Sequence, residues 1–195
     1  MKKLILFTLI IFSSAAVAQK WTAKQLADAN TAKDIPSLST IEIEIIMYIN
    51  LARLFPKEFV KYEVVNYNAL PKYKKDLTKS TYKASLIKEL NALKPLNALV
   101  FDKVPYENAR CLGEEQSKNG KTGHERTTCK DARYGENVSY GMDNSKDVVM
   151  QWLIDEDLVS LGHRKNCLSN SYTKIGVSEH THTKYATSSI ADFLW

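Results

Sequence analysis

The sequence predicts an α+β fold in one domain, because helical patterns come first along the chain and strand patterns come last. Apolar residues recur at intervals of three and four in several segments before residue 155. From Lys174 to the end, β-branched and aromatic residues alternate with polar ones. A chain of 195 residues is long enough to bury a proper core. Helices followed by strands, without βα alternation or a glycine-rich phosphate loop, favour an α+β fold over a nucleotide-binding one.

The first nineteen residues, MKKLILFTLIIFSSAAVAQ, have the pattern of a secretory signal peptide. A basic start is followed by a short apolar run and then by small residues at Ala16 and Ala18, a pattern that signal peptidase recognises. The apolar run is too short to span a membrane, and no later stretch is long and apolar enough. We therefore expect residues 1–19 to be removed and the protein to be secreted or periplasmic, with no membrane span.

Residues 20–38 are polar and irregular, with at most a short helix at 23–29. We expect this N-terminal extension either to wrap the domain or to be disordered, and the domain itself to occupy residues 39–195.

The first firm helix is predicted to start after Ser39. In the stretch STIE, the Ser39 hydroxyl can accept an amide hydrogen near Glu42, whose carboxylate can reach back to form a capping box. Pro56 ends this helix and can start a second one. Another helix is predicted over residues 82–93, because apolar residues follow a helical period there and Pro95 stops it.

Two more helices are predicted in the second half of the chain. Asp102 can cap a helix over about 105–117, which Asn119-Gly120 closes. The last predicted helix starts near Asn144 or Ser145 and buries Val148, Val149 and Trp152.

The strand patterns predict a small antiparallel sheet. Residues 174–180 and 184–195 are expected to form a hairpin, joined by a turn at Thr181–Thr183. A short strand is also expected around Gly135–Val138.

The formal charge is +5, which falls to +3 without the two lysines of the predicted signal peptide, and this is too weak for a nucleic-acid-binding protein, which needs a clustered basic surface. Two of the positive residues, Lys2 and Lys3, also lie in the predicted signal peptide. We therefore expect no nucleic-acid partner.

The three cysteines suit one disulfide and one free thiol in an oxidising compartment. Cys129 follows His124 by five residues and Cys167 follows His163 by four, so the two cysteines come near one another if the histidines meet. This favours a Cys129–Cys167 bridge with Cys111 as a buried thiol. The competing pairing is Cys111–Cys129. Cys167 as a thiol nucleophile beside His163 is disfavoured, because no protease signature surrounds it.

Two histidines and one glutamate stand out as candidate site residues. His124 and His163 each follow a glycine in polar surroundings, and Glu136 lies between Gly135 and Asn137. Two imidazoles and a carboxylate suit a metal in type, but their spacing matches no standard zinc motif. The alternatives are hydrogen-bonded core histidines and a carboxylate that ties down a loop by accepting amide hydrogens.

Three acids, Asp155, Glu156 and Asp157, follow the helix that contains Trp152. They form either an exposed helix end or a functional group, since acids at a helix C-terminus oppose its dipole. In the second case they serve a cation or the neighbouring histidines.

Six motifs together resemble the CAP superfamily, which includes cysteine-rich secretory proteins, antigen 5, plant pathogenesis-related proteins and bacterial SCP-like domains. In chain order they are INLARLFPKEF (49–59), GHE (123–125), GENVSYG (135–141), VVMQWLIDE (148–156), GHRKN (162–166) and KIGVS (174–178). Each motif is weak, but six in this order are specific, and the resemblance covers about residues 39–195.

The resemblance implies a three-layer α-β-α sandwich with an open cleft lined by two histidines and acids. His124 and His163 match the two cleft histidines and Glu136 the first glutamate. The position of the second glutamate holds Asp155, with Glu156 next to it, which is a departure from the family pattern. The resemblance also implies a divalent cation such as zinc at His124 and His163. The family's disulfide pattern does not match these three cysteines.

The expected function is that of a secreted binding or effector module whose partner is a lipid, a sterol or an extracellular protein. The alternative is a secreted hydrolase, a peptidase or esterase, that uses His124, Glu136 and His163. Turnover of a peptide or ester distinguishes the second from the first.

Overall fold

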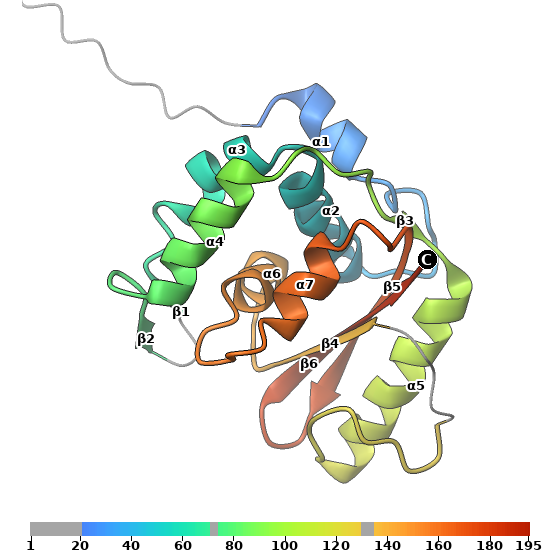
Figure 1. The fold of residues 1–195 in the computed structure, drawn as a ribbon. Coiled ribbons are helices and arrows are strands. Elements are labelled where there is room, and N and C mark those ends of the chain that lie inside the picture. The colour runs from blue at the N-terminus through green and yellow to red at the C-terminus, as the bar shows by residue number, and fades with distance from the viewer. Residues whose placement is uncertain (1–20, 71–73, 130–134) are drawn as a thin grey trace, which may run out of the picture.

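The structure is a computed structural model that describes residues 21–70, 74–129 and 135–195. It has three layers (Figure 1), in which a four-stranded sheet lies between helix α5 on one face and α2, α6 and α7 on the other. The predicted α-β-α sandwich is therefore confirmed. The predicted signal peptide lies outside the described residues. Within the described ranges no helix is long and apolar enough to cross a membrane.

The first half of the chain supplies the helices of one outer layer. They are α1 (Ala23–Ala29), α2 (Thr40–Leu54), α3 (Pro56–Phe59), a π-helical turn η1 (Val60–Val64) and α4 (Thr81–Ala92). The capping box is confirmed, because Ser39 Oγ accepts from the Glu42 amide at 3.3 Å and Glu42 Oε2 accepts from the Ser39 amide at 2.7 Å. Residues that precede this helix pack on it, since Asn50 Nδ2 donates to the carbonyl of Ala29 at 3.0 Å.

Helix α5 (Lys103–Asn119) forms the opposite layer. Asp102 caps it by accepting from the Val104 amide at 2.9 Å, and Gly120 ends it with a positive φ of 67°, as predicted. A Cβ on Gly176 would lie 1.9 Å from the Tyr106 nitrogen, so glycine is required there for α5 to approach the sheet.

Helix α6 (Ser145–Ile154) also matches its prediction, with Asn144 as its cap and Trp152 fully buried. The expectation that it is the last helix is wrong, because α7 (Gly162–Leu168) follows. Helix α7 has seven residues and no side-chain cap, so it lacks both a clear period and a start signal. Its tertiary contacts, described below, hold it in place.

The sheet has the strand order β3-β5-β6-β4. The hairpin of β5 (Lys174–His182) and β6 (Ala186–Leu194) and the short strand β4 (Gly135–Tyr140) are antiparallel, as predicted. Strand β5 extends through Thr181 and His182, so the turn lies later than expected. The short strand β3 (Val100–Phe101) adds one parallel pairing at the other edge. A separate two-stranded sheet pairs β1 (Ala69–Leu70) with β2 (Lys75–Asp76).

The disulfide joins Cys111 to Cys129, with their Cα atoms 5.9 Å apart, and Cys167 is a buried free thiol. The favoured Cys129–Cys167 pairing is therefore wrong, and the competing pairing is found. Cys111 lies on α5 beside the segment that follows this helix, whereas Cys167 lies on α7, across the sheet from α5. Cys167 points into the core, because it is fully buried and Asn137 Nδ2 donates to its Sγ at 3.3 Å.

Candidate functional site

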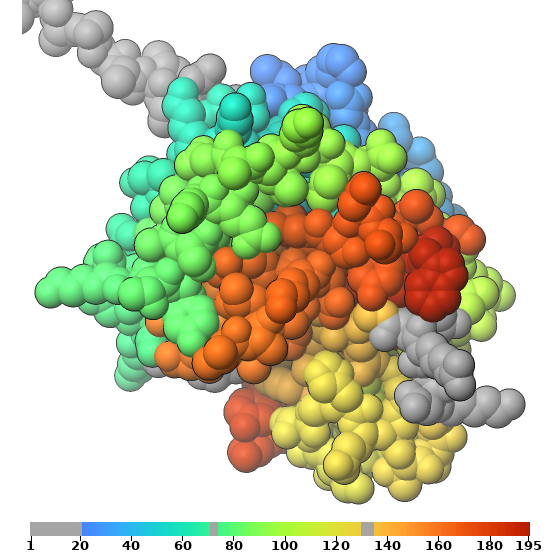
Figure 2. Space-filling model, in the orientation of Figure 1, coloured from blue at the N-terminus to red at the C-terminus, as the bar shows by residue number. Residues whose placement is uncertain are grey.

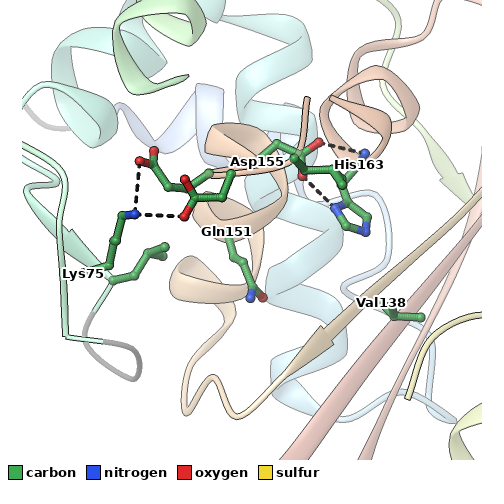
Figure 3. Close-up of a pocket in the computed structure, with 9 residues that line it drawn as sticks. Lys75, Val138, Gln151, Asp155 and His163 are labelled. Atoms are coloured by element: carbon green, nitrogen blue, oxygen red, sulfur yellow. Dashed lines mark hydrogen bonds and ion pairs between the residues drawn. The ribbon is translucent and has the colours of Figure 1, made fainter. Parts of the chain in front are cut away.

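A cavity of about 450 Å³ lies beside α6 and the start of α7. Figure 3 shows its lining side chains, which come from four different parts of the chain. The lining residues are Leu70, Lys75, Val138, Gln151, Asp155, Glu156, Asp157, Leu158 and His163. Three of the predicted cleft residues, Asp155, Glu156 and His163, are therefore part of one cavity.

His163 and Asp155 form a hydrogen-bonded pair at this cavity. Asp155 Oδ1 lies 2.8 Å from His163 Nδ1, and Asp155 Oδ2 accepts from the main-chain amides of His163 at 3.0 Å and Arg164 at 3.3 Å. The Asp155 side chain is 3% exposed and that of His163 is 23% exposed. Since the carboxylate engages Nδ1, Nε2 is left to point away from Asp155 (Figure 3).

The backbone conformation of Asp155 explains how its carboxylate comes to lie against the start of α7. It ends α6 in the left-handed conformation with a φ of 55°, which Asp tolerates better than most residues. The chain then turns back, so that the carboxylate faces the first amides of α7. Of the three acids, Asp155 thus serves a neighbouring histidine, which was one of the two readings of this stretch.

Asn137 ties the motif GENVSYG to the motif GHRKN. Its Nδ2 donates to the carbonyl of His163 at 3.0 Å, and its Oδ1 accepts from Asn166 Nδ2 at 2.9 Å. Asn166 Nδ2 also lies 3.3 Å from the carbonyl of Glu136. Because Asn137 is fully buried, these bonds fix the position of His163 relative to β4.

Arg164 fixes the other side of α7. The guanidinium is 1% exposed and donates to the carbonyls of Leu153 at 2.6 Å and of Ile154 and Tyr82 at 2.9 Å. It also reaches Ser85 Oγ at 2.9 Å. These contacts bind α7 to the end of α6 and to α4, and they thereby fix the position of His163 at the start of α7.

Charged residues form one rim of the cavity. Lys75 Nζ lies 2.8 Å from Asp157 Oδ2 and 3.7 Å from Glu156 Oε1, and Ser80 donates to Glu156. Figure 3 shows Lys75 reaching from β2 toward these acids. Glu156, predicted as a cleft residue, is therefore part of a salt-bridged rim rather than a partner of His163.

His124 forms a second pair, with Glu136. Its Nδ1 lies 2.8 Å from Glu136 Oε1, and its side chain is 55% exposed. The other Glu136 oxygen, Oε2, accepts from Arg126. His124 lines a separate hollow of about 340 Å³ together with Glu125, Arg126 and Cys129. Figure 2 shows the yellow segment after α5 below the orange surface of α7.

Several contacts hold the segment that carries His124. Glu115 on α5 accepts from the amides of Thr128 at 3.1 Å and Cys129 at 3.2 Å, and also from that of Thr127. The hydrogen bond from Thr127 and those from the neighbouring amides lower the pKa of Glu115 to about 2. With the Cys111–Cys129 bridge, these bonds attach the segment to α5.

The structure thus pairs each candidate histidine with its own carboxylate. Strand alternation explains why: Asn137 faces α7, whereas its neighbour Glu136 faces α5 and the segment of residues 120–129. A single cleft shared by His124, Glu136 and His163 stays a prediction.

The donor set does not fit a cation held jointly by imidazoles and carboxylates. Both oxygens of Glu136 are engaged, by His124 and Arg126, and both oxygens of Asp155 are engaged by His163 and main-chain amides. Across residues 21–70, 74–129 and 135–195, no three His, Cys, Asp or Glu side chains are grouped so that they could hold a metal ion. The carboxylates orient the imidazoles instead.

Three side chains of this region, Gln151, Lys75 and Arg126, were not among the residues predicted from the sequence. Gln151 lies one turn before Asp155 on α6, so helical spacing could have placed it at the cavity. Arg126 directly follows the GHE motif, so its position in the sequence could also have indicated a place at the site. Lys75 reaches the cavity through the β1–β2 hairpin, and nothing local in the sequence indicates this contact.

One comparison with known proteins, that with protein-family models, agrees with the motifs. The family model described as CAP, the cysteine-rich secretory protein family, matches residues 84–191. No curated protein sequence matches the chain. Among solved structures, an outer surface protein from Borrelia burgdorferi is similar at 21% identity and a TM-score of 0.41, over 61% of this chain and 94% of that one. The family match covers more than half of the sequence, and the chain therefore belongs to the CAP family.

Proposed function

We propose that this protein is an exported CAP-domain binding module that holds a small extracellular ligand in the His163 cavity. The observation that carries the proposal is the His163–Asp155 pair at a 450 Å³ cavity, because it fixes through Nδ1 an imidazole that lines a space of ligand size. Export is proposed from the signal-peptide pattern of residues 1–19 and from the family.

The cavity favours a ligand with an apolar body and one polar group. Leu70, Val138 and Leu158 supply apolar surface, while His163 and Gln151 supply hydrogen-bonding groups. The lipid or sterol class expected from the resemblance fits this pattern in chemistry. The divalent cation implied by the resemblance is not part of the proposal, because the carboxylates already bind the imidazoles and Arg126.

Ligand-observed NMR with a fragment library tests the proposal. Leu158 lies on the cavity wall at 38% exposure, and its neighbour Val159 is 88% exposed and does not line the cavity. Leu158→Trp should therefore fill the cavity and abolish the saturation-transfer signals of wild-type binders. Val159→Trp is the matched control and should retain them. Fragments that bind all three proteins equally would contradict a ligand site at this cavity.

A hydrolase is the second candidate, and the same pair favours it. With Nδ1 engaged by Asp155, Nε2 of His163 is placed to take a proton from an attacking water, which would add to an ester or amide carbonyl. The proton would then pass to the leaving group. Ser139 is 2% exposed and donates to Gln151, so it is not available as a nucleophile. Hydrolysis of 4-nitrophenyl acetate that is faster than with His163→Gln would favour this candidate over pure binding.

A further inference from the structure

The second feature of interest is a buried corner of acids beneath His124. Glu136 on β4 and Asp192 on β6 are direct partners in the antiparallel register, so their side chains lie side by side on one face of the sheet. Asp192 is fully buried and the side chain of Glu136 is 12% exposed. Two carboxyl groups in this arrangement repel each other when both are ionised, and a positive charge beside them reduces this repulsion.

Arg126 supplies that charge from the segment after α5. Its side chain is 6% exposed, it donates to Glu136 Oε2, and its NH2 lies 3.9 Å from Asp192 Oδ2. The other terminal nitrogen, NH1, donates to the carbonyl of Asn108 on α5 at 3.3 Å. The guanidinium therefore joins three elements of the fold at one point.

The two carboxyl oxygens of Asp192 differ in their partners. Its Oδ2 accepts from Asn108 Nδ2, whereas its Oδ1 is buried and has no hydrogen-bond partner among the described residues. Carboxyl oxygens and an imidazole, here those of Glu136, Asp192 and His124, are the kinds of group that bind a divalent cation, but with Arg126 in place they are not grouped to hold one within the described residues.

We propose that the guanidinium of Arg126 takes the place of a divalent metal ion at Glu136 and Asp192, so that Glu136 binds His124 without a metal ion. Arg126 and His124 bind the two oxygens of the same carboxylate. Arg126 is thus a positioning residue that turns Oε1 of Glu136 toward His124.

The test is a titration with cobalt(II), followed by its visible absorption, and with zinc, followed by calorimetry. Arg126→Gln removes the charge but keeps a side chain that can hydrogen-bond. Arg110→Gln is the matched control, because Arg110 forms an exposed ion pair with Glu114 on α5. Wild type and Arg110→Gln should show no saturable binding up to about 1 mM, and Arg126→Gln should bind at least about tenfold more tightly. Adding Glu136→Gln to Arg126→Gln should remove the gain.

Two results would overturn the proposal. One is saturable zinc binding by the wild type that His124→Ala removes, since it would show that Arg126 does not occupy the cation's place. The other is a folded Arg126→Gln protein that gains no affinity. If Arg126→Gln does not fold, Arg126→Lys decides the matter: it keeps a positive charge and should leave the protein folded and without saturable cobalt binding. Saturable cobalt binding by Arg126→Lys would contradict the proposal.

Discussion

Asn137 donates its side-chain amide to the main-chain carbonyl of His163 at 3.0 Å, across 26 positions of sequence. This bond explains why the stretches GEN and GHRKN matter together. Asn137 does not face a ligand; it holds the first turn of α7 against β4 and thereby aims His163.

Replacing Asn137 by Ala should destabilise the protein by about 2–4 kcal/mol, because it leaves buried polar groups of His163 and Asn166 without their partner. Urea denaturation measures the change. Asn91→Ala, at an exposed position of α4, is the control and should be neutral or slightly stabilising. Equal stabilities of the two variants would show that the amide network contributes nothing.

Arg53 should be one of the most sensitive positions for stability. The side chain is 1% exposed and donates to the carbonyls of Asn97, Cys167, Ser169 and Tyr172. Burial lowers its pKa to about 10, so it remains charged at neutral pH. Arg53→Met should cost roughly 3–5 kcal/mol in chemical denaturation, since four carbonyls lose their donor. Arg110→Met, at an exposed ion pair, should change stability by less than about 0.5 kcal/mol, and a similar small effect at Arg53 would refute the argument.

Non-reducing peptide mapping should recover Cys111 linked to Cys129, and reduction should lower the melting temperature. A bridge between residues 18 positions apart contributes about 3 kcal/mol by the chain-entropy estimate. Cys167 should resist iodoacetamide in the folded protein, because it is fully buried and burial raises the pKa of its thiol. Rapid labelling of Cys167 without denaturant would contradict the structure.

Asp192 should make the protein less stable as the pH rises. Burial and the charge of Glu136 raise the pKa of Asp192 from 3.8 to about 8. Between these two values the folded state binds more protons than the unfolded state, so the free energy of unfolding falls with increasing pH. Below about pH 4 the contribution is fully present, and above about pH 8 it is lost. Denaturation curves of Asp192→Asn should show a weaker decline over this window, and an unchanged decline would rule out Asp192 as its source.

The sequence was informative wherever a local signal sets the structure. Ser39 and Glu42 form the predicted capping box, Asp102 and Gly120 bound α5, and the alternation after Lys174 forms the β5–β6 hairpin. Each of these features depends on residues within a few positions of one another.

The failures concern structure that distant contacts decide. Arg164 on α7 donates to the carbonyl of Tyr82 on α4, and Asn137 on β4 donates to the carbonyl of His163. Helix α7 depends on these contacts and not on a helical period in its own sequence. The cysteine pairing was wrong because closeness in sequence to a histidine says nothing about the face of the sheet on which each cysteine lies. The roles of Lys75 and Arg126 likewise follow from tertiary neighbours.

The tautomer of His163 tests the central claim most directly. Asp155 at Nδ1 should hold the neutral imidazole with its proton on that nitrogen and leave Nε2, on the side of the ring away from Asp155, as an acceptor. Long-range ¹H–¹⁵N correlation NMR, recorded at a pH where the ring is neutral, reports which nitrogen carries the proton. Asp155→Gly removes the carboxylate without backbone strain, since position 155 has a positive φ, and Asp155→Asn keeps an acceptor. The account predicts the Nδ1–H form in the wild type and in Asp155→Asn, and a mixture of tautomers in Asp155→Gly; a wild-type His163 protonated on Nε2 would contradict it.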